Sequence, residues 1–160
     1  MKQLISHILT AVTGTDASIL AAKYAVIMAK QYHSKMSAVY VVDTATIRQL
    51  TLSKIFIQEE AVDYEKNLES NGDRYLAFVD ELAHAKGVKI EKAIRRGAIF
   101  TEIIHIADEK KADIILLGGW EKDTHTRDII GHSHREIMAN SKCSVILVKE
   151  PNIDQIYKNA

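Results

Sequence analysis

The sequence contains a single cysteine and a single proline among its 160 residues. One thiol cannot build a disulfide framework, so a reducing compartment is the simpler setting for this chain. Because Cys143 lies inside the apolar run 143–148, we interpret it as a small buried hydrophobic residue rather than a reactive nucleophile. No apolar stretch approaches the roughly 20 residues that a bilayer span requires, and no signal peptide precedes the first apolar run. We therefore expect a cytoplasmic protein without a membrane partner.

An excess of either charge is also lacking, because 21 lysines and arginines balance 21 aspartates and glutamates. A nucleic-acid-binding surface calls for a basic surplus, so we expect no nucleic-acid partner. Hydrophobic residues make up 47% of the chain, which is enough for one domain to bury a core without metals or disulfides.

What the sequence does contain is an alternation of short apolar runs with longer helical stretches. The apolar runs predict strands at residues 4–12, 36–42, 88–95, 112–117 and 143–148. Helical spacing predicts helices at 17–33, 56–86, 99–107 and 132–140, with a loop or short irregular helix at 43–54. We expect Thr15 or Asp16 to cap the first helix, a kink near residues 70–73, and Gly87 at the end of the second helix. The alternating pattern of 88–95 suits a sheet edge.

Five strands separated by helices predict an α/β fold: a single doubly wound five-stranded parallel sheet with helices on both faces. In such folds a ligand binds beyond the carboxyl ends of the strands, at the point where the strand order reverses. The loops that follow the first and fourth strands, residues 13–16 and 118–131, therefore form the candidate site.

Those loops and their strands carry a family resemblance. Residues 112–118 (ADIILLG) resemble a strand of the universal stress protein family, and 141–148 (SKCSVILV) resemble its closing strand. Residues 8–15 and 97–103 resemble its opening strand and turn and the start of one of its helices. Because these pieces keep the family's order and spacing over about residues 4–148, the sequence is identified as a member. The resemblance implies an adenine nucleotide alpha hydrolase-like, Rossmann-like fold, with a family domain over 1–150. The composition of residues 151–160 predicts a polar C-terminal tail.

In nucleotide-binding members of the family, the loop after the fourth strand reads Gly, two residues, Gly, nine residues, Gly, then Ser or Thr. Backbone N–H groups and a helix N-terminus offer partial positive charge to phosphates there. The resemblance therefore implies ATP or AMP as a possible ligand, with no certain cofactor. The candidate binding residues that it implies are Ala11, Val12, Thr13, Val41, Leu117, Gly118, Gly119, Glu121, Gly131, His132 and Ser133.

Three of these positions depart from the family pattern. Glu121 replaces the middle glycine and would repel a triphosphate, unless Gly119 takes over the role of that glycine. His132 stands where a hydroxyl closes the loop, and Thr13 stands where a carboxylate contacts the adenosine. These changes predict a degenerate nucleotide site.

Other side chains suggest alternative chemistry. His125, His132 and His134 could converge on a metal if that stretch is loop, but a solvated polar loop is the simpler interpretation, and we predict no metal site. Ser133 lacks the strand-to-helix elbow of a hydrolase nucleophile. Trp120 could stack on a ligand or simply anchor the loop. No convincing acid–base pair is present, so we expect a protein that is not an enzyme, with weak ATP hydrolysis left open.

The resemblance also implies a homodimer in which the last strand pairs with its copy. The candidate interface residues, an apolar edge without inward charge, are Ser144, Val145, Ile146, Leu147 and Val148. The tail after Pro151 could pack across the partner or fray.

Three functions remain: a regulatory protein that binds a nucleotide or small ligand, a dimeric interaction protein without ligand, and a weak ATP-hydrolysing enzyme. We favour a dimeric regulatory protein of the universal stress type that has a degenerate crevice and acts by binding. Genuine ATP binding through the retained outer glycines is its main alternative.

Overall fold

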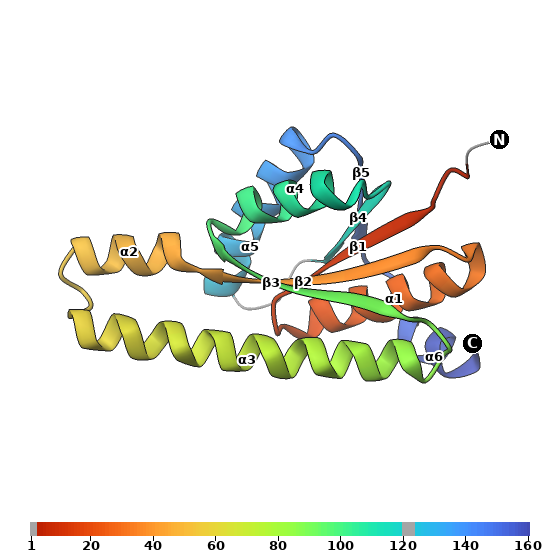
Figure 1. Cartoon of the computed structure of the whole chain (residues 1–160), viewed down its shortest axis with the longest axis horizontal. Coiled ribbons are helices and arrows are strands. Elements are labelled where there is room, and N and C mark those ends of the chain that lie inside the picture. The colour runs from red at the N-terminus through yellow and green to blue at the C-terminus, as the bar shows by residue number, and fades with distance from the viewer. Residues whose placement is uncertain (1–2, 120–123) are drawn as a thin grey trace.

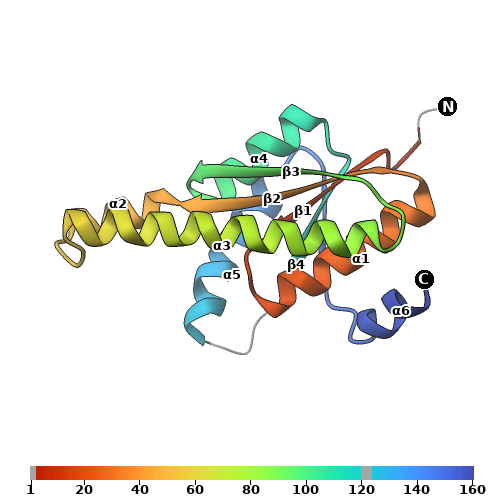
Figure 2. The same cartoon turned by 60° about the horizontal axis from the view of Figure 1, so that its bottom comes forward.

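The computed structural model describes the backbone of residues 3–119 and 124–160, and the side chains of residues 3–119 and 131–160. The described elements are, in chain order, β1 (His7–Val12), α1 (Asp16–Tyr32), β2 (Lys35–Asp43), α2 (Thr44–Leu52), α3 (Gln58–His84), β3 (Ile90–Gly97), α4 (Ile99–Lys110), β4 (Ile114–Gly118), α5 (Thr124–Asn140), β5 (Ser144–Val148) and α6 (Ile153–Asn159). The strands form one parallel sheet in the order β3-β2-β1-β4-β5. Helices α1, α3 and α6 lie on one side of the sheet, and α4 and α5 on the other (Figures 1 and 2). The predicted doubly wound α/β fold is confirmed.

The strand order reverses between β1 and β4, at the middle of the sheet. Both strands are buried along their whole length, which explains why both are apolar at nearly every position. In β1, Ile8 and Val12 belong to the core under α1 and α3, whereas Leu9 and Ala11 belong to the core under α4. The carboxyl ends of β1 and β4 therefore mark the switch point at which this kind of fold binds ligands.

The first strand is shorter than predicted. Leu4 is 87% exposed, and pairing with β2 begins only at His7. One oxygen of the Asp113 carboxylate accepts hydrogen bonds from the backbone N–H of Ser6 at 2.7 Å and of His7 at 3.0 Å. This carboxylate satisfies donors that precede the sheet ladder, and it ties the start of β1 to the residue just before β4.

Side-chain caps begin the helices that follow β1 and β2. Thr15 Oγ1 accepts a hydrogen bond from the backbone N–H of Ser18 at 3.2 Å. Of the two predicted caps of α1, Thr15 and Asp16, it is therefore Thr15 that caps the helix. Asp43 accepts both the backbone N–H of Thr46, at 3.0 Å, and its hydroxyl, at 2.7 Å. The segment predicted as a loop or short helix is therefore mainly helical.

The kink or loosening predicted near residues 70–73 is wrong, because α3 is a single helix of 27 residues that runs straight in Figure 1. Gly72 is buried on the sheet side of this helix, where its missing side chain leaves room for the ring of Tyr40 on β2. The glycine thus serves close packing rather than a break in the helix. Gly87 follows the helix with a φ of 75°, the left-handed conformation expected of a glycine beyond a helix C-terminus.

Two segments that were predicted as irregular are helical. The loop predicted over 118–131 is wrong in its second half, because α5 begins at Thr124 and contains Gly131, which is buried. A glycine is a poor helix former in isolation, but packing of α5 on α4 and β5 overrides that preference. The residues expected to form a polar tail fold as α6, with Ile153 buried and Lys23 of α1 paired with Asp154 at 2.6 Å.

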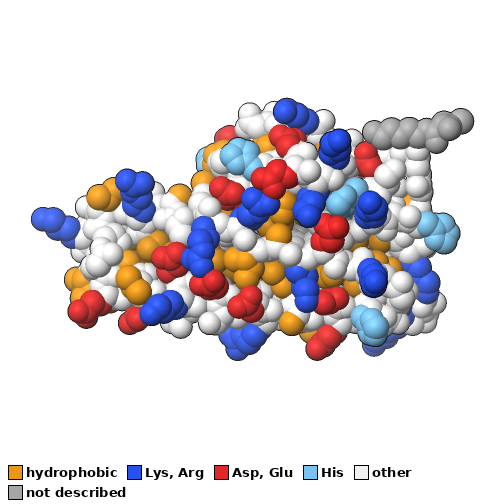
Figure 3. Space-filling view, in the orientation of Figure 1, with side chains coloured by type: hydrophobic (Ala, Val, Ile, Leu, Met, Phe, Trp, Pro, Cys, Tyr) orange, Lys and Arg blue, Asp and Glu red, His pale blue; other side chains and the backbone are white. Residues whose placement is uncertain are grey.

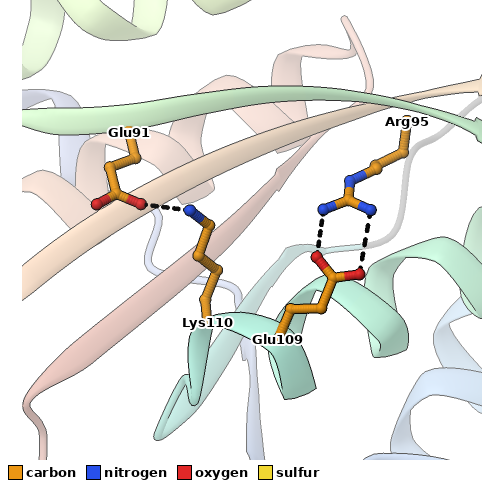
Figure 4. Close-up of polar contacts among 4 residues, drawn as sticks. All are labelled: Glu91, Arg95, Glu109 and Lys110. Carbon is orange, nitrogen blue, oxygen red and sulfur yellow. Dashed lines mark hydrogen bonds and ion pairs between the residues drawn. The ribbon is translucent and has the colours of Figure 1, made fainter.

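Strand β3 lies at a sheet edge, as predicted, and its two pairs of adjacent charged residues connect it to both helical layers. Glu91 and Arg95 pair with Lys110 and Glu109 of α4, the first pair at 2.7 Å and the second through two hydrogen bonds (Figure 4). On the opposite face, Lys92 pairs with Asp80 at 2.7 Å, and Arg96 pairs at 2.6 Å with Glu65 and with Glu69, all three on α3. Charged residues of this kind discourage pairing of the edge with another chain.

Within residues 3–119 and 124–160, none of the helices combines the length and apolarity that spanning a membrane requires.

Candidate functional site

A narrow cavity lies where the carboxyl ends of β1 and β4 separate, and we call it the switch-point cavity. Its volume is ≈ 30 Å³, room for one or two water molecules. The described lining residues are Ala11, Thr13, Thr15, Ala17, Ser18, Ile99, Ile103, Leu117, Gly118, Gly119, Ser133, His134 and Ile137. They come from the ends of β1 and β4 and from the first turns of α1 and α4, together with α5, as the switch-point rule predicts.

A larger cavity of ≈ 220 Å³ lies between the ends of β1 and β2 and helices α2, α3 and α4, and we call it the α2 cavity. Its described lining residues are Val12, Thr13, Val39, Tyr40, Val41, Asp43, Thr46, Ile47, Leu50, Tyr64, Leu68, Ile99 and Ile103. Thr13, Ile99 and Ile103 line both cavities, so the two adjoin. Mostly apolar walls beside a polar turn suit a ligand with a flat apolar ring and a polar end.

The turn between β1 and α1 forms the polar rim of both cavities. The backbone N–H of Thr13 donates to Ser18 Oγ at 3.1 Å, and the hydroxyls of Thr13 and Thr15 lie 3.0 Å apart. Ser18 Oγ in turn donates to the backbone carbonyl of Thr15 at 3.0 Å. These bonds hold three neutral hydroxyls in fixed positions, and Thr13 is exposed to solvent at the mouth of the site.

Gly118 and Gly119 are required by close backbone packing. A Cβ on Gly118 would lie 2.7 Å from the carbonyl carbon of Ala17, and one on Gly119 would lie 2.7 Å from the carbonyl oxygen of Val148. Both obstacles are backbone atoms and cannot move aside as a flexible side chain would. The two glycines therefore let the end of β4 approach the first turn of α1 and the end of β5 while they line the cavity.

Three consecutive residues of α5 differ in what they face. His132 is exposed and its ring meets Phe100 of α4 edge-on at 5.9 Å, so it is not among the described lining residues of either cavity. Ser133 and His134 are buried and line the switch-point cavity. Burial lowers the pKa of His134 from 6.5 to about 4, so its ring is neutral at physiological pH.

Most of the predicted site residues come together in space. Those in the switch-point cavity are Ala11, Thr13, Leu117, Gly118, Gly119 and Ser133, and those in the α2 cavity are Val12, Thr13 and Val41. Gly131 is buried in α5 and is not among the described lining residues of either cavity. Glu121 and Trp120 lie outside the described residues, as does the side chain of His125. Their roles in ligand binding stay predictions.

No group of three or more histidine, cysteine or carboxylate side chains that could hold a metal ion occurs among the described residues. The exposed ring of His132 packs on Phe100, whereas the next histidine along α5, His134, is buried beside the switch-point cavity.

Sequence reasoning missed the wall that α4 provides and the cavity-facing position of His134. The spacing of 99–107 predicts only a helix, although Ile99 and Ile103 of that helix line both cavities. Their position in the first two turns after β3 was an available signal, because the helix that follows a parallel strand starts at the carboxyl edge of the sheet.

The strand order and the cavities beside β1 and β4 define a class of protein, the doubly wound α/β domains with a ligand crevice at the carboxyl edge of the sheet. The model of the universal stress protein family matches residues 5–149. Universal stress protein MJ0531 of Methanocaldococcus jannaschii is 31% identical over 150 residues, which cover 94% of this chain and 85% of the relative. The chain therefore belongs to the universal stress protein family.

Solved structures agree at the level of the fold. A universal stress protein family member from Burkholderia pseudomallei matches 94% of this chain and 100% of its own, with a TM-score of 0.72 and 19% identity. A family member from Arabidopsis thaliana with AMP bound matches 93% of this chain and 94% of its own, with a TM-score of 0.63 and 15% identity.

Proposed function

We propose that this protein is a stress-response regulatory protein that binds an adenine nucleotide or a similar small ligand at the switch point and acts by binding. The observation that carries the proposal is the pair of adjoining cavities at the carboxyl ends of β1, β2 and β4. Proteins of the same fold have been solved with AMP, dAMP and cAMP. Each of these ligands has a flat ring for an apolar cavity and a polar end for a hydroxyl-lined rim.

In the proposed complex, the base enters the α2 cavity beside Val41 and Tyr40, and the sugar lies against Thr13 at the junction of the two cavities. The phosphate then points toward the backbone at Gly118 and Gly119. A nucleoside monophosphate is favoured over ATP, because the site retains only part of the glycine pattern of ATP-binding relatives. In support, Gly131 is part of α5 and His132 packs on Phe100.

Binding without turnover is favoured by the titratable groups that line the described cavity walls. Asp43 already accepts two hydrogen bonds from Thr46 as a helix cap, so it is poorly placed to serve as a general base. The lowered pKa of His134 makes it a weak base at neutral pH, and burial also restricts its access to a substrate. The proposal therefore assigns ligand sensing, rather than chemistry, to this site.

Calorimetric titration of the full chain with AMP, and with ATP plus magnesium, tests the proposal. We expect saturable heat with AMP and weaker heat with ATP. Val41→Trp, which fills the α2 cavity, should lower AMP affinity at least tenfold, whereas Ala77→Trp on the exposed face of α3 should leave it unchanged. Absence of heat and of a melting-temperature shift with every nucleotide would refute nucleotide binding, and ATP turnover that Val41→Trp abolishes would refute binding without catalysis.

We also propose that the protein forms a homodimer through β5. The difference between the two edges of the sheet supports this. The β3 edge carries ion pairs to both helical layers, whereas β5 presents the half-buried Val145, Ile146 and Leu147 at the other edge. A dimer would have twice the chain mass of 17.9 kDa in sedimentation at micromolar concentration. A single species of chain mass at every concentration would contradict it.

A further inference from the structure

Helix α2, the connection to α3 and the first two turns of α3 project from one end of the molecule as a helical hairpin, which we call the α2–α3 tip (residues 44–64; Figure 1). The tip carries large hydrophobic side chains that face solvent. Leu52 is 75% exposed, Ile55 65% and Ile57 59%, and Val62 and Tyr64 add 40% and 44%. In Figure 3, hydrophobic side chains are visible at this end of the molecule as several small areas between charged side chains. Leu52, Ile55 and Ile57, at the end of the hairpin, expose on the order of 350 Å² together, within the range of the largest apolar patches on monomeric proteins.

The charges beside this patch are divided by sign. Arg48 and Lys54 lie on α2 and just after it, whereas Glu59, Glu60 and Asp63 lie in the first two turns of α3. Figure 3 shows the same division, with lysine and arginine side chains along α2 and carboxylates at the start of α3. The tip therefore has a basic flank, an apolar centre and an acidic flank.

These charges contrast with those elsewhere on the surface. The charged residues of β3 each pair with a helix, as Lys92 does with Asp80. At the tip, all five charged residues are exposed, and none forms an ion pair with another residue of the described part of the chain. Both signs of charge thus remain available to a partner on either side of an apolar centre.

We propose that the α2–α3 tip is an interface at which a second copy of this chain docks about a two-fold axis. A two-fold axis through the apolar centre brings the basic flank of each copy onto the acidic flank of the other, because an isologous interface pairs residue i with j and j with i. The tip is complementary to itself, so it needs no partner of different charge. An anionic membrane surface fits less well, since Glu59, Glu60 and Asp63 would be repelled.

The size of the patch sets the strength of this association. Two apolar centres of about 350 Å² bury about 700 Å² in total, to which the charged flanks add, so the interface lies at the weak, transient end of protein interfaces. We therefore expect a reversible, concentration-dependent step in the micromolar range. It is separate from pairing through β5, which lies at the opposite edge of the sheet, although Tyr64 of the tip also lines the α2 cavity.

Charge reversal in the full chain tests the two-fold arrangement. One variant carries Arg48→Glu and Lys54→Glu, so both of its flanks are acidic, and the other carries Glu59→Lys and Glu60→Lys, which makes the α3 flank basic. In sedimentation velocity, we expect each variant alone to associate at least tenfold more weakly than the wild type. An equimolar mixture of the two should recover association, because every contact across the axis again joins opposite charges. The wild-type step should also weaken at high salt.

Two further variants distinguish association through the tip from nonspecific hydrophobic association. Ile55→Glu places a charge in the apolar centre and should abolish the association step, whereas Leu4→Glu, at an exposed apolar residue outside the tip, should leave it unchanged. A β5-paired dimer would persist in all these variants. The proposal is overturned if the wild type shows no concentration-dependent step beyond any β5 dimer. It is also overturned if the step survives Ile55→Glu, or if the mixture associates no better than either charge variant alone.

Discussion

Replacing Gly72 with alanine should destabilise the protein, although the same change stabilises most exposed helices. The glycine lies inside α3, where alanine is favoured over glycine by about 1 kcal/mol. An added Cβ would, however, lie 2.8 Å from Cε1 and 3.0 Å from Cγ of Tyr40, and closer still to Cδ1. The Tyr40 ring is 6% exposed and stacks on Tyr75 with 6.3 Å between ring centroids, so it cannot turn aside without disturbing a second ring.

The magnitude follows from two opposing contributions. Overpacking a well-filled core costs about 1–3 kcal/mol, and the gain in helix propensity offsets about 1 kcal/mol of that cost. We therefore expect Gly72→Ala to lower the free energy of unfolding by about 1 kcal/mol. Since Tyr40 also lines the α2 cavity, displacement of its ring should reduce ligand affinity as well.

Urea denaturation of matched variants tests this reasoning. Ser70→Gly and Ser70→Ala, at an exposed position of the same helix, measure the local glycine–alanine difference without a packing term. The double variant Tyr40→Leu with Gly72→Ala should lose less stability than the sum of the two single changes, because the ring that obstructs the methyl group is gone. If Gly72→Ala alone gains as much stability as the Ser70 pair predicts, the close approach of α3 to Tyr40 is wrong.

Two further predictions concern buried polar groups. Burial lowers the pKa of His134 to about 4, so the unfolded state takes up a proton at a higher pH than the folded state does. The free energy of unfolding should therefore fall by about 2–3 kcal/mol as pH falls from 6.5 to 4.5. The free energy of unfolding of His134→Gln should fall less steeply over that range, and parallel profiles would contradict the assignment; His7, whose pKa is also lowered, affects both proteins equally. Tyr157→Phe removes the 2.6 Å hydrogen bond from the Tyr157 hydroxyl to the carbonyl of Leu82 and should cost about 1 kcal/mol of stability. Tyr32→Phe, at an exposed ring, should cost nothing measurable, and equal losses in the two variants would refute a role for α6 in holding α3.

The strands could be predicted from the sequence because the apolar or polar character of each strand residue follows its burial. β1 and β4 are buried on both faces, so they appear as continuous apolar runs, whereas the alternation of apolar residues in and just before β3 identified it as an edge. Helix boundaries near glycine were less predictable. Gly72 and Gly131 are predicted as interruptions, but each is buried within a helix, and Gly72 faces Tyr40 of β2. Such packing depends on residues distant in the sequence, which local propensity cannot detect.

The same distinction between local pattern and distant contacts decides which residues of the candidate site could be predicted. Thr13, Gly118 and Gly119 could be placed at the site because each ends or directly follows a strand whose carboxyl end lies at the switch point. Ile99 belongs to a helix that crosses the sheet, so its place at the cavity depends on the path of the crossover and not on its own neighbours. The exposed position of His132 likewise depends on the contact of its ring with Phe100, a residue on another helix.

The α2–α3 tip suggests how the two proposals of ligand binding and self-association would be connected. Its inner side supplies Ile47 and Leu50 to the α2 cavity, whereas Leu52 and Ile55 at its end face solvent. A ligand that orders this hairpin reduces the entropy that docking must remove, so the two binding events should favour each other by the same factor. AMP should therefore bind more tightly at protein concentrations above the association midpoint than below it. Saturating AMP should raise the association constant by the same factor. If the protein binds AMP and also associates, but its AMP affinity is the same at both concentrations, the coupling is refuted. The hairpin would then be equally ordered in every state.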